Sequence, residues 1–161
     1  MKHVDIYSDG AAKGNPGRGG FGALLRFISA DGAVYDREIS KGFVNTTNNR
    51  MELLGVIEAL EALKAPCDVT VHTDSQYVVK AFTQRWIENW ARQGWMTAAR
   101  KPVKNVDLWQ RLLEAMNGHE VAYVWVKGHD GNPENERCDE LATLAADGEE
   151  LQEDAGYVAG A

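Results

Sequence analysis

The chain has 161 residues, of which 44% are hydrophobic and 25% are charged, and these are ordinary values for one globular domain with its own core. No apolar run reaches the roughly 18 residues of a membrane-spanning helix, and the first residues lack the apolar segment of a secretory signal. We therefore expect a cytoplasmic protein without a membrane anchor. The net charge of −7, taken alone, argues against a nucleic-acid partner.

The distribution of the charge changes that conclusion. Seven acidic residues and no Lys or Arg follow Arg137, so they account for the whole net charge. Within the neutral remainder, residues 85–104 hold five basic residues against Glu88 alone. A local excess of this size is sufficient to bind a polyanion. Residues 148–161, which combine acidic with small side chains, are predicted to form a flexible tail.

The first predicted element is a strand. Residues 4–9 alternate between apolar and polar side chains and end at Asp9, directly before a glycine, which predicts a strand followed by a turn. Residues 69–73 repeat this design and end at Asp74. Ligands of open α/β sheets bind at the carboxyl ends of strands, so we expect Asp9 and Asp74 to meet at one edge.

Two further strands and a helix lie between these segments. The glycine-rich residues 14–22 contain a G-x-G-x-x-G pattern, but they lead into a predicted strand at 23–28. A dinucleotide site requires a helix there, so a tight turn between strands is the better interpretation. Residues 34–39 predict a third strand, and residues 51–60 predict a helix with apolar side chains at helical spacing. Glu52 lies at its start, where the helix dipole favours an acidic residue.

The rest of the chain completes an α/β pattern. Residues 121–126 predict a strand, and helices are predicted over 75–82, 107–116 and 134–146. The order predicts a mixed five-stranded sheet flanked by helices. We expect one domain, residues 1–147, followed by the tail.

Four carboxylates occupy positions suited to a metal site: Asp9, Glu52, Asp74 and Asp139. Neighbouring carboxylates repel and raise one another's pKa, and a divalent cation removes that conflict. Oxygen ligands suit Mg²⁺ or Mn²⁺, whereas no Cys/His cluster has zinc spacing. Two such ions can promote phosphodiester hydrolysis. Each Asp taken separately is more often a turn or cap residue, so spacing alone leaves both interpretations open.

Longer blocks of sequence are more specific. They are residues 7–10 (YSDG), 14–17 (GNPG), 46–53 (TTNNRMEL), 73–78 (TDSQYV), 101–109 (KPVKNVDLW), 125–129 (WVKGH) and 133–142 (PENERCDELA). Over about residues 3–146 the chain thereby resembles the bacterial type 1 ribonuclease H family, ribonuclease HI, and the blocks follow the order of that family.

The resemblance implies a ribonuclease H-like fold with a basic handle at about residues 84–104. It implies an endonuclease that cleaves the RNA strand of RNA–DNA hybrids and leaves 5′-phosphate and 3′-hydroxyl ends. Two Mg²⁺ ions, with Mn²⁺ as a possible substitute, would be held by Asp9, Glu52, Asp74 and Asp139, with Asp9 shared. His129 resembles the family's loop histidine, which moves protons or helps the product leave; without the motif it would be a surface residue.

The resemblance also implies the substrate contacts. Short polar donors near the metals test for the 2′-hydroxyl of RNA, a glycine lets the backbone approach, and a separate pocket holds a DNA phosphate. In the handle, aromatic and basic side chains would lie against sugars and phosphates. The implied residues are Gly10, Asn48, Asn49 and Gln76 near the metals, Asn15 and Thr47 in the phosphate pocket, and Trp86, Arg92 and Lys101 in the handle. Asn and Thr are common in loops, and Trp90 and Trp95 could equally form the core of the handle.

Three alternatives compete with this interpretation. The first is a hybrid-binding module without catalysis, which would have no reason to keep all four carboxylates. The second is a resolvase or integrase core, which the handle and the polar donors disfavour. The third is a phosphatase for small phosphates, for which no basic residue is aimed at a free phosphate. We expect a monomeric ribonuclease H, whose handle is less basic after Trp90 than is usual and so binds hybrids more weakly or with more salt sensitivity.

Overall fold

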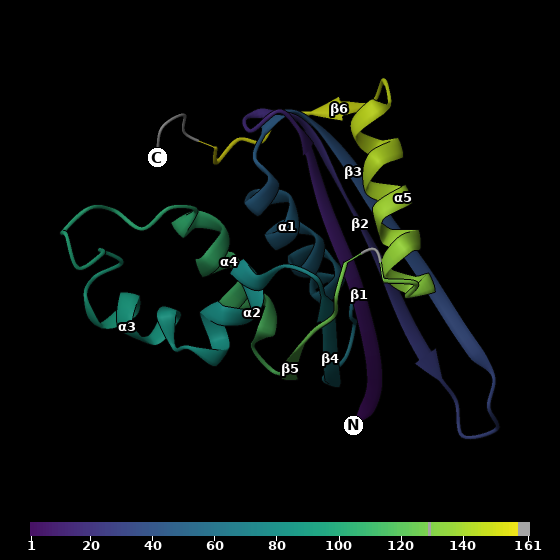
Figure 1. Ribbon diagram of the computed structural model, residues 1–161. Coiled ribbons are helices and arrows are strands. Elements are labelled where there is room, and N and C mark those ends of the chain that lie inside the picture. Colours follow the sequence, from purple (N-terminus) through teal and green to yellow (C-terminus); the bar gives the residue numbers. More distant parts are fainter. Residues whose placement is uncertain (129, 158–161) are drawn as a thin grey trace.

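The computed structural model describes residues 1–128 and 130–157. Three strands come first along the chain, and helices with three further strands follow, as labelled in Figure 1. They are β1 (Lys2–Lys13), β2 (Gly17–Ile28), β3 (Val34–Thr46), α1 (Asn48–Glu61), β4 (Cys67–Thr73), α2 (Gln76–Thr83), α3 (Trp86–Arg92), α4 (Val106–Met116), β5 (Glu120–Trp125), α5 (Pro133–Asp147) and β6 (Leu151–Gln152).

The strands form one mixed sheet in the order β5-β4-β1-β2-β3-β6. The hairpin-linked strands β1, β2 and β3 pair antiparallel, whereas β4 pairs parallel to β1, and β5 parallel to β4. This confirms the predicted α/β class and the mixed sheet. The sheet has six strands rather than the predicted five, because the two-residue strand β6 pairs with β3.

Helices cover both faces of the sheet. Helix α1 packs against β1 and β2 and contacts α4 behind it, while α5 packs across β2, β1 and β3 on the other side (Figure 1). Because α1 lies between the sheet and α4, it is apolar around much of its circumference. Leu53, Val56 and Ile57 are each fully buried, together with Ile6 and Val71 of the sheet. This core fixes the start of α1 against β1 at Gly10, three residues before that strand ends.

The segment after α5 differs from the predicted flexible tail over its described part. Leu151 pairs with Gly42 of β3, and the carboxylate of Asp154 accepts hydrogen bonds from Arg50 at 2.6 and 2.9 Å. The Arg50 and Asp154 side chains are only 2% and 5% exposed. Burial of a guanidinium is favourable only when carboxylates pair with it. The pair between Arg50 and Asp154 therefore holds the acidic segment against the rest of the domain.

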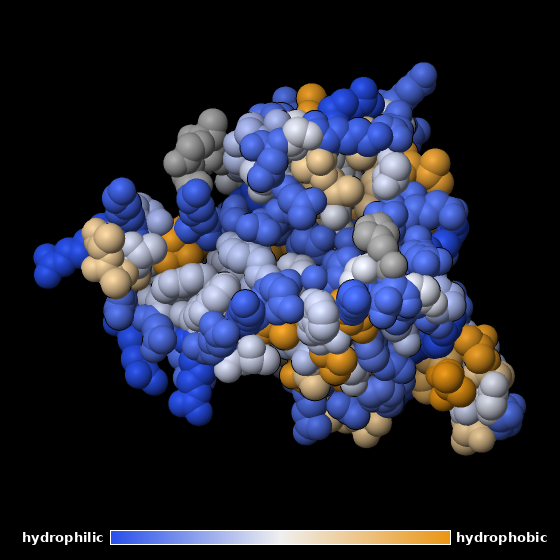
Figure 2. Space-filling model, viewed as in Figure 1, coloured by the Kyte–Doolittle hydropathy of each residue, from blue (hydrophilic) through white to orange (hydrophobic). Residues whose placement is uncertain are grey.

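The β2–β3 hairpin extends away from the rest of the molecule (Figure 1). Apolar side chains gather on its tip in Figure 2, where Ile28 and Val34 are 54% and 55% exposed.

Among the described residues, no helix is long and apolar enough to cross a membrane.

We expect Asp154→Asn to lower the free energy of unfolding by roughly 2–3 kcal/mol, because the buried Arg50 would lose its buried carboxylate partner and keep only the exposed Asp107. The exposed neighbour Glu153 offers a matched control, Glu153→Gln, which should stay within about 0.5 kcal/mol of the wild type. Urea denaturation of the three proteins measures the difference. Equal stability of Asp154→Asn and Glu153→Gln would contradict the assignment.

Candidate active site

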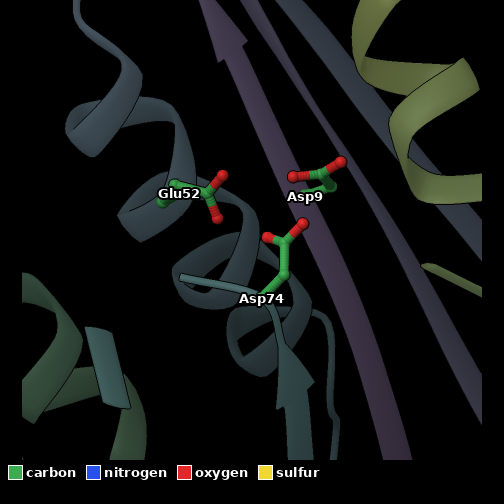
Figure 3. Close-up of side chains that lie close together, drawn as sticks. All are labelled: Asp9, Glu52 and Asp74. Atoms are coloured by element: carbon green, nitrogen blue, oxygen red, sulfur yellow. The ribbon is translucent and has the colours of Figure 1, made fainter. Parts of the chain in front are cut away.

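Three carboxylates meet beside the carboxyl end of β4. Asp74 follows that strand as predicted, whereas Asp9 lies within β1, which continues to Lys13 instead of ending in the predicted turn. Strands β1 and β4 are parallel neighbours with Ser8 opposite Thr73, so the residues that follow, Asp9 and Asp74, lie side by side. Glu52 reaches the same point from the first turns of α1 (Figure 3). One carboxylate oxygen from each of Asp9, Glu52 and Asp74 lies within 4.8 Å of the other two. The structure therefore brings three of the four predicted carboxylates into one group.

Gly10 makes this approach possible. A Cβ atom there would lie 2.5 Å from the backbone nitrogen of Glu52, so only a glycine lets α1 pack directly on β1. The Gly10 N–H donates to Asp9 Oδ1 at 2.9 Å and to Glu52 Oε1 at 3.0 Å. One backbone donor thus orients two carboxylates.

Burial gives the group its unusual electrostatics. Burial, reinforced by the charge of Asp74, raises the pKa of Asp9 to about 7. Burial and then the charges of Asp9 and Asp74 raise the pKa of Glu52 well above its usual value. Within the described part of the chain, the buried Glu52 Oε2 has no hydrogen-bond partner. A divalent cation supplies what such a set lacks, a positive charge and a ligand for the orphaned oxygen.

Asp139, the fourth predicted carboxylate, enters from α5. It lies outside the tight group but lines the same cavity of about 350 Å³, and its charge contributes to the raised pKa of Asp9. Gly10, Asn48, Asn49 and Gln76 line this cavity as well. The residues predicted to test for the 2′-hydroxyl therefore border the carboxylates.

A second cavity, of about 450 Å³, adjoins the start of α1. Asn15 and Thr47 line it, together with Asn48 and Lys104. The Asn15 Oδ1 accepts the N–H of Asn48 at 3.0 Å, and Thr47 caps α1 by accepting the N–H of Arg50 at 3.3 Å. Asn15 and Thr47 therefore each use a side-chain oxygen to hold the start of α1 in place, which is a role typical of loop and cap residues.

The handle separates its predicted contacts. Trp86 and Lys101 line a third cavity, of about 660 Å³. Trp90 lies with its ring centroid 6.0 Å from that of Trp86 and 5.8 Å from that of the fully buried Trp109, so it packs into the base of the handle. Arg92 is not brought to these residues; it lies on exposed α3 with its guanidinium 3.9 Å from Glu88. His129 lies outside the described residues.

Sequence reasoning did not single out Tyr77. It lines both the carboxylate cavity and the handle cavity. Its hydroxyl accepts hydrogen bonds from Asn105 and from the indole of Trp109, each at 3.1 Å, and so ties α2 to the base of the handle. Its place directly after Gln76, in the block at residues 73–78, was the available signal.

Comparison with known proteins identifies the family and the fold. The chain matches the RNase H family over residues 1–147. It belongs to that family. A ribonuclease H from Lachnoclostridium phytofermentans is 58% identical over 152 residues, which make up 94% of this chain and 96% of the relative. A ribonuclease H from Salmonella arizonae is 56% identical over 159 residues, 99% of this chain and 98% of the relative.

Solved RNase H structures share the architecture. LC9-RNase H1, a type 1 RNase H with the type 2 active-site motif, has a TM-score of 0.83 at 35% identity. The match spans 98% of this chain and 77% of the LC9-RNase H1 chain. LC11-RNase H1, solved with an RNA/DNA hybrid, has a TM-score of 0.65 at 26% identity and covers 89% of this chain and 96% of its own. The RNase H family is metal-dependent, and the group of Asp9, Glu52 and Asp74 fits that dependence.

We expect Asp9→Asn to unfold at a higher temperature than the wild type when divalent ions are absent, because the substitution removes one of three mutually repelling carboxylates. Adding a divalent ion should stabilise the wild type by about 1–3 kcal/mol at 10 to 100 times its dissociation constant and leave Asp9→Asn nearly unchanged. Thermal unfolding with and without the ion measures both effects.

The exposed Glu149 supplies the control, since Glu149→Gln changes the net charge equally but lies outside the group. It should follow the wild type in both conditions. An ion that stabilises Asp9→Asn as much as the wild type would place the binding elsewhere.

Proposed function

We propose that this protein is an endonuclease that hydrolyses the RNA strand of RNA–DNA hybrids and leaves 5′-phosphate and 3′-hydroxyl ends. The observation that carries the proposal is the convergence of Asp9, Glu52 and Asp74 in a cavity bordered by polar amides, in a chain that belongs to the RNase H family. The relatives that share more than half of its residues are ribonucleases H.

The metal site that we propose uses Asp9, Glu52, Asp74 and Asp139. Mg²⁺, with Mn²⁺ as a possible substitute, is the proposed ion, and two such ions, when bound, polarise the scissile phosphodiester and stabilise charge on the leaving oxygen. The chain itself orients the ligands, since the Gly10 N–H holds an oxygen of Asp9 and one of Glu52. It thus pre-organises the site before substrate arrives.

The substrate contacts that we propose divide between two strands. The exposed amides of Asn48, Asn49 and Gln76 border the carboxylates, where they can donate to or accept from a 2′-hydroxyl of the RNA strand. Asn15 and Thr47 face the neighbouring cavity and would receive a phosphate of the DNA strand.

The handle extends this surface. Trp86 and Lys101 line one cavity, where an aromatic face and a cation suit a sugar and its phosphate, and Arg92 would add charge from exposed α3. His129 is proposed, by resemblance alone, to move a proton or to help the product leave.

The proposed setting is a monomer in the cytoplasm. Both cysteines, Cys67 and Cys138, are free and buried, as suits a reducing compartment. Residues 1–147 are proposed as the catalytic domain, and this range coincides with the match to the family.

Cleavage of labelled nucleic acids tests the function directly. We expect the wild type with Mg²⁺ to cut the RNA strand of an RNA–DNA hybrid and to leave single-stranded RNA, duplex RNA and duplex DNA intact. A chelator should abolish the cut, and Asp9→Asn should slow it more than about 100-fold, because even groups that only orient metal ligands contribute about 10- to 100-fold.

Glu149→Gln, on the exposed segment after α5, should cleave as the wild type does. Binding of the hybrid without cleavage would favour the non-catalytic module, and cleavage of duplex DNA would favour a resolvase or integrase.

Salt dependence tests the handle. We expect Lys101→Gln to weaken hybrid binding at every sequence and to reduce the slope of log affinity against log salt by about one, because one phosphate contact is lost. Binding is measured in the Asp9→Asn background, so that no cleavage interferes. Lys64→Gln, beyond the opposite end of α1, is the matched control and should keep the full slope. The same slope in both variants would contradict a phosphate contact at Lys101.

A further inference from the structure

The segment after β6 ends in a turn that sits on the start of α1. Figure 1 shows this segment crossing over the N-terminal end of α1. Asp154 Oδ2 accepts from Arg50 Nε at 2.6 Å and from Thr46 Oγ1 at 2.7 Å, and Asp154 Oδ1 accepts from Arg50 Nη2 at 2.9 Å. On its other edge Arg50 donates to both oxygens of Asp107, at 2.9 and 2.7 Å. One buried guanidinium thus joins α1, α4 and the C-terminal segment.

The turn itself is fixed by this ion pair. The Tyr157 N–H donates to the carbonyl oxygen of Asp154 at 3.0 Å, which closes the turn. Gly156 lies against the side chains of Asp107 and Arg50 so closely that a Cβ atom would collide with the Asp107 carboxylate. The position of Tyr157 therefore depends on Arg50, although the two residues are far apart in the sequence.

Tyr157 and Gly156 form one wall of the cavity whose other walls carry Asn15, Thr47 and Lys104. Tyr157 is only partly buried, so part of it is open to solvent at this cavity. Arg50 pairs with both Asp107 and Asp154, so this trio carries one positive and two negative charges, and Asp107 also lines the cavity. The exposed Lys104 is a lining cation to which no ion pair occurs within the described ranges. The acidic segment thus adds no unpaired carboxylate to the cavity from Asp154.

We propose that Tyr157 is a further substrate contact, whose hydroxyl donates to a phosphate of the strand that lies against Asn15 and Thr47. Asp154 and Arg50 are positioning residues, which hold the turn that carries Tyr157. This inference rests on the proposed function, since that function supplies the polyanion. A hydroxyl donor to a phosphate oxygen contributes affinity without reading sequence, and it places the strand relative to the neighbouring carboxylates.

The test compares Tyr157→Phe with the wild type in steady-state cleavage of a fluorescent RNA–DNA hybrid. The substitution removes only the hydroxyl and keeps the ring, so the turn is expected to fold. We expect KM to rise about tenfold, the loss of one hydrogen bond to a charged group, while kcat changes less than about twofold because the group contacts the strand away from the reacting atoms. Tyr35→Phe, on the exposed tip of the β2–β3 hairpin, is the matched control and should leave KM unchanged.

A second measurement identifies the phosphate. Hybrids with a single neutral methylphosphonate at successive positions of the DNA strand should show one position at which the wild-type KM rises about tenfold and the KM of Tyr157→Phe rises no further. Such non-additivity is the signature of a direct contact. Asp154→Asn should also raise the KM of the unmodified hybrid, because it releases the turn that carries Tyr157. The methylphosphonate at the identified position should then raise the KM of Asp154→Asn no further.

The outcomes separate the two proposals. If the wild type fails to cut the hybrid, the proposed function fails. If the wild type cuts the hybrid and Tyr157→Phe keeps the wild-type KM, or loses kcat and thermal stability without a change in KM, this inference alone is overturned. Additive effects of Tyr157→Phe and every methylphosphonate position would also overturn it.

Discussion

The main physical constraint on this structure is that three carboxylates lie closer together than their charges favour. Asp9, Glu52 and Asp74 each offer an oxygen within 4.8 Å of the others, and Glu52 is only 4% exposed. Burial and mutual repulsion both oppose ionisation there, and the raised pKa of Asp9 and that of Glu52 record this cost. The sheet and α1 must supply the compensating stability through the apolar core between them. The fold thus imposes an electrostatic cost at this site, and a bound divalent cation would lower that cost.

The first turns of α1 carry a second buried charge, and this one is paired with side chains of the chain itself. Arg50 lies two residues before Glu52, faces α4 and the C-terminal segment, and has two carboxylate partners within 3 Å. Removal of either carboxylate would leave the buried guanidinium with a single partner and lower the stability of the fold. Helix α1 is therefore fixed on one side by an ion-pair network that is complete within the chain. On its other side lies Glu52, which belongs to the group of three carboxylates that a divalent cation would neutralise.

Aromatic packing joins the handle to the body of the domain. The fully buried Trp109 on α4 meets Trp90 of α3 and Tyr77 of α2, so the base of the handle shares the core of the domain. Basic side chains such as Arg92 remain on its exposed surface. This division lets the handle present a rigid apolar base and a solvated charged face to a polyanion.

The sequence by itself determined the fold class, the order of the elements and the family. Strand alternation and the long motif blocks are local properties, and the predicted strands are present in the structure. Helix α1 is also where its apolar residues predict it, but it is buried on most sides and not on one face, because it lies between the sheet and α4. Asp9 and Asp74 were expected to meet at the ends of two strands. The register of β1 and β4 does bring them together, although Asp9 lies within β1 and only Asp74 follows a strand end. The assignment of the individual site residues remains a prediction for experiment.

Only the tertiary structure decided which polar side chains are buried and with whom. Composition predicted a free acidic tail, whereas Asp154 lies against Arg50, 104 residues earlier in the chain. Asn15 and Thr47 partly hold the start of α1, Trp90 packs at the base of the handle, and Arg92 stays apart. Such pairings depend on the distances between segments after folding, and no local periodicity encodes those distances.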